Sequence, residues 1–188
     1  MMKIDKKSLV KPILVLTILC VVASALLGLT DAVTRDKIDQ IERENKAKAM
    51  ELVFVDADSF GDEQEQDKFT FSEAKQGDTL LGYVITTTVQ GYGGDIDVMT
   101  GVNADGSIRR VTILKADDET PGLGQNTKKP AFLDQFEGKQ GELTVVKGSA
   151  GGGSEILAVT SATISSTAVT KAVNASRAFF EDTLKGGI

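Results

Sequence analysis

A cluster of side-chain hydroxyls lies near the end of the chain, in residues 159–168 (VTSATISSTA). Six of these ten residues are Ser or Thr, and none is an acid, a base or a metal ligand. Hydroxyls can hydrogen-bond to phosphate oxygens or be esterified by a phosphoryl group. No neighbouring residue could activate one of them as a nucleophile, so the cluster does not predict a self-contained serine hydrolase.

Thr163 stands where a predicted strand, residues 156–160, ends and a predicted helix begins. The start of a helix carries free backbone N–H groups and the positive end of the helix dipole, so it suits a phosphate. Thr163 could therefore hold a phosphate or be joined to one. In the ordinary alternative, these hydroxyls close a strand and cap a helix, with Ser165 or Ser166 as the N-cap and Ala162 packing between them.

Two glycine-containing loops could bring backbone close to a flat ligand. In residues 119–124 (ETPGLG), Pro121 fixes one φ angle, and its two glycines permit a close approach. Tyr92 precedes a second pair of glycines in residues 91–94 (GYGG). The alternatives are a tight surface turn for the first loop, and for the second a strand connection with Tyr92 packed on the core.

The segments around these motifs predict an α+β fold with a mainly antiparallel sheet and flanking helices. Residues 80–89, 95–102 and 107–114 are β-branched or alternate in polarity, and NADG between the last two is a hairpin turn signal. Further segments are expected as a loop with a short strand (56–77), a short helix (130–136), a strand (142–146) and a flexible turn (148–153).

The last segment predicts an amphipathic helix that stops at Gly186. One face of it carries residues at helical spacing, namely Ala168, Val169, Ala172, Val173, Ser176, Phe179 and Phe180.

An uncharged segment of 18 residues, 12–29, is close to the length that a membrane helix needs. Four lysines precede it, which predicts a cytoplasmic N-terminus and an outer C-terminal body. A signal-peptide cleavage after Ala25 is the alternative, but the apolar run continues through Leu29. The expected parts are a cytoplasmic N-terminus (1–11), a transmembrane helix (12–30), a helical connector (31–55) and an extracytoplasmic domain (56–188).

Composition excludes several classes of function. With 21 Lys+Arg against 27 Asp+Glu, the net charge of −6 argues against a nucleic-acid-binding protein. The chain has no histidine, so imidazole-based proton transfer and His-metal sites are excluded. Cys20 is the single cysteine, so no disulfide can form within the chain.

Four motifs, in this order along the chain, resemble the FMN-binding domains of the RnfG and NqrC subunits of ion-pumping redox complexes. They are the central hairpin from Tyr92 to Gly106, the loop ETPGLG (119–124), FLDQFEG (132–138) and TSATIS (160–165). The length of the chain and its N-terminal helix resemble RnfG more than NqrC. Ser161 and Leu157 stand where that family usually has Gly and Asp, and no His precedes the ETPGLG loop.

The resemblance implies one FMN joined by a phosphoester to Thr163. A separate flavin transferase would install it from FAD, which explains why the cluster contains no base. The other residues implied to contact FMN are Tyr92, Gly93, Glu119, Thr120, Gly122, Leu123, Gly124, Thr160, Ser161, Ala162, Ser165 and Ser166.

The implied function is an electron-carrier subunit of an Rnf-type ferredoxin:NAD⁺ oxidoreductase, without a complete catalytic site of its own. Its location would be the outer side of the cell (inner) membrane, with RnfA, RnfB, RnfC, RnfD and RnfE as partners. Two alternatives stay open: an anchored binding module without flavin, and a stand-alone FMN domain that feeds an extracellular reductase.

Overall fold

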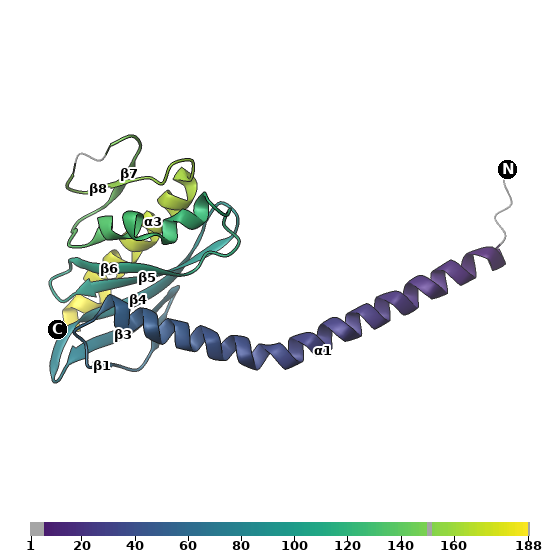
Figure 1. The fold of residues 1–188 in the computed structure, drawn as a ribbon. Helices are drawn as coiled ribbons and strands as arrows, with labels where there is room; N and C mark the ends of the chain where they lie inside the picture. The colour runs from purple at the N-terminus through teal and green to yellow at the C-terminus, as the bar shows by residue number, and fades with distance from the viewer. Residues whose placement is uncertain (1–5, 150–151, 188) are drawn as a thin grey trace. The chain divides into compact units, whose positions relative to one another are not determined.

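The computed structural model describes residues 6–149 and 152–187 of the chain (Figure 1). Its contacts divide the chain into two units, Met1–Asn45 and Lys46–Ile188. Residues 1–5 of the predicted cytoplasmic segment and residues 150–151 of the predicted turn lie outside the described residues.

Helix α1 (Lys6–Val53) is continuous through the predicted membrane span and the predicted connector, with no break between them. Within the described residues it is the one helix long and apolar enough to cross a membrane. Thr17 and Thr30 satisfy their hydroxyls inside the helix, each donating to the carbonyl four residues earlier at 2.9 Å. Such internal bonds suit a helix in lipid, where no water is available to polar groups.

The second unit is built on an antiparallel sheet in the order β1-β3-β4-β5-β6, with β2 paired to β3. Strands β4 (Thr79–Gln90), β5 (Asp95–Asn103) and β6 (Ile108–Lys115) confirm the three strands predicted there, and β6 forms one edge of the sheet. The remaining strands are β1 (Ser59–Phe60), β2 (Gln64–Gln66) and β3 (Phe69–Gln76).

The prediction of a loop with one short strand over residues 56–77 is wrong in extent, because the range holds β1, β2 and the full eight-residue strand β3. Its apolar residues pack on the C-terminal helix: the ring of Phe69 stacks on Phe179 with centroids 4.5 Å apart, and Phe71 lies 5.4 Å from the same ring. These contacts bury one face of a strand whose other residues are mostly polar.

Helices cover both faces of the sheet. Helix α3 (Thr163–Phe179) packs on the face formed by Ile96 and Val98 of β5, while the end of α1 packs on the opposite face around Met99 (Figure 1). At Gly101 a β-carbon would lie 2.3 Å from Val53 Cγ1, so only glycine permits this approach of α1 to the sheet.

The start and end of the C-terminal helix differ from the prediction. Neither Ser165 nor Ser166 is the N-cap, because α3 begins at Thr163 with Ala162 as its cap and both serine hydroxyls are bonded elsewhere. Gly186 does not stop the helical turns, which continue past Phe179 as a π turn, η3 (Phe180–Leu184), and a 3-10 turn, η4 (Lys185–Gly187). The predicted apolar face of α3 is buried.

A small parallel ribbon, β7 (Thr144–Val146) and β8 (Glu155–Leu157), carries the chain toward the hydroxyl cluster. Both strands are shorter than predicted. An amide side chain holds each one: Asn174 bonds both backbone polar groups of Leu143, at 2.9 and 2.8 Å, and Gln135 bonds both of Leu157, at 2.7 and 3.2 Å. Gln135 belongs to a segment of short helical turns, namely η1 (Gly124–Lys128), α2 (Pro130–Leu133) and η2 (Asp134–Phe136).

Candidate functional site

A cavity of about 520 Å³ lies at the start of α3, where three segments that are distant in the sequence meet. The turn after β4, the loop after β6 and the hydroxyl cluster each contribute to its wall. The lining residues are Tyr92, Glu119, Thr120, Leu123, Gly124, Ser161, Ala162, Thr163, Ile164 and Ser165. The structure thus brings together nine of the thirteen residues predicted from the sequence.

Thr163 is the first residue of α3 and is partly buried in the wall of this cavity. The first backbone bond of the helix runs from Ser166 N–H to the carbonyl of Ala162 at 3.0 Å. The N–H groups of the first turn precede that bond and lie at the positive end of a 17-residue helix. Thr163 also lines a smaller cavity of about 240 Å³ together with Lys171. A phosphate on Thr163 would therefore lie at the positive end of the helix dipole.

Glu119 joins the three segments through hydrogen bonds to its carboxylate. Its side chain is 1% exposed, and its Oε1 accepts the backbone N–H groups of Tyr92 at 2.6 Å and Gly93 at 3.2 Å. Its Oε2 accepts the hydroxyl of Ser165, at 2.6 Å, from the first turn of α3. One buried carboxylate therefore fixes the turn after β4 and the helix start against its own loop.

The glycines of the two loops are needed for contact with this carboxylate and its neighbour. A β-carbon on Gly124 would lie 1.9 Å from Glu119 Oε2, and one on Gly93 would lie 1.9 Å from the carbonyl oxygen of Asp118. The sequence suggests that such glycines let backbone approach a ligand. Here Gly93 lets the turn after β4 approach the loop after β6, and Gly124 leaves room for the Glu119 carboxylate within its own loop. Gly122 has φ +76°, a left-handed conformation suited to glycine.

Three large apolar side chains lie exposed at the cavity. Tyr92 is 68% exposed, Leu123 41% and Ile164 57%, and all three line the cavity. The alternative in which Tyr92 packs on the core is therefore wrong. Exposed large apolar side chains that gather at one cavity suit a flat aromatic ligand. Ile164 was not among the predicted residues, although its place between Thr163 and Ser165 is a signal that could have found it.

Four predicted residues lie beside the cavity rather than in its wall. Gly122 and Thr160 line an adjoining cavity of about 530 Å³. Gly93 contributes its backbone N–H to Glu119. The hydroxyl of Ser166 points inward, donating to the carbonyl of Ala162 at 2.9 Å and accepting the N–H of Val159 at 3.0 Å.

Ser161 has φ +63°, so it adopts the left-handed conformation that the usual glycine of this motif would take freely. A non-glycine residue in this conformation lowers the stability of the fold by about 1–2 kcal/mol. Glycine avoids this strain but lowers the stability by roughly 0.5–1 kcal/mol, because its unfolded chain has more conformational entropy to lose. We expect Ser161→Gly to raise the free energy of unfolding by about 0.5–1 kcal/mol in a thermal or denaturant titration. Ser161→Ala keeps the strain and should bring no gain. A glycine variant no more stable than wild type would contradict the strain.

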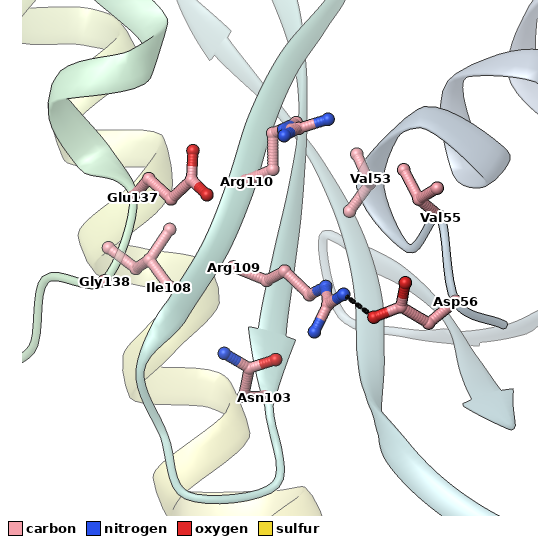
Figure 2. A pocket seen from close by; sticks show the side chains of 9 residues that line it. All are labelled: Val53, Val55, Asp56, Asn103, Ile108, Arg109, Arg110, Glu137 and Gly138. Carbon is pink, nitrogen blue, oxygen red and sulfur yellow. Dashed lines mark hydrogen bonds and ion pairs between the residues drawn. The ribbon is translucent and has the colours of Figure 1, made fainter. Parts of the chain in front are cut away.

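A second cavity, of about 440 Å³, lies near the end of α1 and carries no hydroxyl cluster (Figure 2). Its two arginines already have partners. Arg109 is ion-paired with Asp56, and Arg110 Nη1 donates to the carbonyl of Leu52 at 2.9 Å. The groups that could bind an anion there hold the end of α1 to the sheet instead.

The chain matches the family of FMN-binding domains over residues 91–177, which include all three segments of the first cavity. It is 35% identical to the G subunit of the Na(+)-translocating ferredoxin:NAD(+) oxidoreductase complex of Acetobacterium woodii, over 97% of each chain. It is 34% identical to the G subunit of the proton-translocating ferredoxin:NAD(+) oxidoreductase complex of Clostridium ljungdahlii, over 84% of each.

Solved structures show the same fold. The C subunit of the Na(+)-translocating NADH-quinone reductase of Parabacteroides distasonis matches with a TM-score of 0.52 at 24% identity, over 60% of this chain and 61% of its own. Shewanella oneidensis NqrC matches with a TM-score of 0.55 at 20% identity, over 71% and 72%.

The fold and the cavity define an FMN-binding domain of the α+β class, as predicted, carried on a long N-terminal helix. The chain belongs to the family of the G subunits of Rnf-type, ion-translocating ferredoxin:NAD⁺ oxidoreductase complexes, which confirms the family predicted from the four motifs.

Proposed function

We propose that this chain is an electron-carrier subunit whose single FMN is joined through its phosphate to the hydroxyl of Thr163. The observation that carries the proposal is the position of Thr163, at the first turn of α3 in the wall of a cavity that also exposes three large apolar side chains. Family membership supports the carrier role within an Rnf-type ferredoxin:NAD⁺ oxidoreductase.

Attachment would be a phosphoryl transfer from FAD. The Thr163 oxygen forms a bond to the phosphorus that bears the riboflavin part, and the P–O–P bond of FAD breaks. AMP leaves with the bridging oxygen, and the proton of the hydroxyl passes to a base. No His exists in the chain, and among the residues that the structure describes Glu119 is the one acid in the wall of the cavity, where it already accepts three hydrogen bonds. A separate flavin transferase is therefore the proposed source of the base.

The residues of the cavity suit the parts of FMN. The N–H groups of the first turn of α3 and the hydroxyl of Thr163 suit the phosphate, while Tyr92, Leu123 and Ile164 offer apolar surface to the ring. When bound, FMN supplies the electron-transfer chemistry, and the protein binds it, orients it and sets its surroundings.

Two residues of this chain depart from the usual motif, Ser161 and Leu157. The backbone conformation at Ser161 and the backbone hydrogen bonds at Leu157 are compatible with the motif, and this supports attachment of flavin. Ser161 adopts a left-handed conformation, which a glycine at this position would adopt freely. Leu157, which replaces the usual Asp, is held through its backbone by Gln135, so the replaced side chain is not needed for this contact. The binding module without flavin is therefore the weaker alternative. A match over 97% of a relative that belongs to a complex likewise favours a complex over a stand-alone reductase domain.

We also propose the sidedness of the chain. The lysines before the apolar segment favour a cytoplasmic N-terminus, and the FMN domain would then lie on the outer side of the cell membrane. There a cofactor lost by dissociation could not readily be regained, so a covalent link has a physical advantage. The other Rnf subunits are its proposed electron donors and acceptors.

The decisive experiment is ultraviolet-excited fluorescence of the denatured full-length chain on a gel, after expression with and without a flavin transferase. A fluorescent band is expected only with the transferase. In a separate measurement, multi-span membrane subunits are expected to co-purify with the chain. A protein that is yellow in its native state but dark on the gel would retain FMN binding and overturn the covalent link. A colourless protein would overturn both.

A further inference from the structure

Glu119 carries chemistry that its position in a loop motif does not explain. A carboxylate that is 1% exposed is costly to bury unless it is hydrogen-bonded. Here two backbone N–H groups and the Ser165 hydroxyl all donate to it, so the deprotonated form accepts from every partner. The same side chain lines the cavity proposed for FMN. A fixed negative charge thus lies in the wall of that cavity, shielded from solvent.

We propose that Glu119 is a positioning residue whose buried carboxylate assembles the three walls of the flavin cavity and whose charge lowers the reduction potential of the bound FMN. The inference rests on the proposed function. Reduction adds negative charge to the flavin, and a fixed anion nearby disfavours this. Because the Glu119 carboxylate is 1% exposed, its interaction with the flavin is screened weakly by solvent, so it acts more strongly than a surface charge would.

Two substitutions distinguish the effect of the Glu119 charge from the effect of its hydrogen bonds. Glu119→Gln keeps the shape and removes the charge: its oxygen can still accept the N–H groups of Tyr92 and Gly93, and its amide can donate to Ser165 Oγ. Glu119→Ala removes the contacts as well, leaving two backbone N–H groups and a hydroxyl without their acceptor.

A matched control removes a charge at the surface of the same loop. The Asp117 side chain is 75% exposed and pairs with Lys128 at 3.1 Å. Asp117→Asn makes the same change in net charge as Glu119→Gln, two residues away, without touching the three hydrogen bonds. It should leave the flavin potential close to that of wild type.

The test is a redox titration of the full-length flavinylated chain in detergent, together with thermal unfolding. We expect Glu119→Gln to raise the midpoint potential of the flavin by about 30 mV. For a two-electron couple, this shift corresponds to a tenfold change in the ratio of oxidised to reduced flavin at a given potential. Glu119→Ala should lose most of its attached flavin and unfold at a lower temperature. A potential unchanged in Glu119→Gln, or shifted equally in Asp117→Asn, would overturn the role of the charge.

A second variant keeps the test decisive if Glu119→Gln fails to fold. Ser165→Ala removes one donor and leaves the carboxylate less neutralised, so the potential should stay the same or fall. A rise in Ser165→Ala would overturn the proposal, because loosening alone would then move the potential upward. A wild-type chain without any flavin would instead overturn the proposed function, so the two failures are distinguishable.

Discussion

Thr163→Ala is expected to abolish covalent flavin completely while leaving the fold intact. The reason is chemical, because the variant lacks the oxygen that would bond to phosphorus. Alanine is well tolerated in the first turn of a helix, and Thr163 is only partly buried. The free energy of unfolding should therefore stay within about 0.5 kcal/mol of wild type. The measurement is fluorescence of the denatured band, with the mass of the intact chain showing the presence or absence of one flavin.

Two control variants define the position of the link. Thr163→Ser keeps a hydroxyl at the same helix position and should retain some attachment. Thr160→Ala removes an exposed hydroxyl that lines the adjoining cavity, and it should remain fully flavinylated. Fluorescence that survives denaturation in Thr163→Ala would place the flavin on another hydroxyl, and peptide mapping would then identify it.

The sheet could be predicted where local pattern and tertiary contact agree. In β4, β5 and β6, β-branched or alternating residues are bounded by turn signals, and both faces of the resulting strands are covered. For β3 the sequence predicts only a short strand within a loop, because its apolar residues are interspersed with polar ones. The full strand is favoured by the contact of Phe69 and Phe71 with Phe179. That contact joins residues more than a hundred positions apart, which periodicity within a short window does not register.

The site shows the same division between local and distant information. Composition and spacing single out the hydroxyl cluster, but the N-cap assignment of Ser165 was wrong because its hydroxyl donates to Glu119, 46 residues away. Glu119 itself could be named only as part of a loop motif. Its contacts with Tyr92 and Gly93 are 27 and 26 residues distant, and they depend on the register of β4, β5 and β6. Chemical type was predictable, whereas the bonding of each group was not.

Gln135 is a further residue whose importance lies in a long-range contact. Its amide spans both backbone groups of Leu157, 22 residues away, and Leu157 ends β8 six residues before Thr163. We expect Gln135→Leu to lower the free energy of unfolding by about 2–3 kcal/mol, because the N–H and carbonyl of a partly buried strand end lose their partner. For a chain of this size the melting temperature should fall by roughly 5–10 °C.

The same substitution should also reduce the attached flavin, because the strand that leads to Thr163 loses its anchor. Asn174→Leu is the matched control. It breaks an equivalent pair of bonds, to Leu143 immediately before β7, but that strand does not run into the hydroxyl cluster. Stability should fall in both variants, whereas attachment should fall only in Gln135→Leu. Equal loss of flavin in the two would show that general destabilisation is the cause. A Gln135→Leu chain that melts like wild type would show that the amide contributes little, and β8 would then owe its position to its pairing with β7 and to the burial of Ile156 in the core.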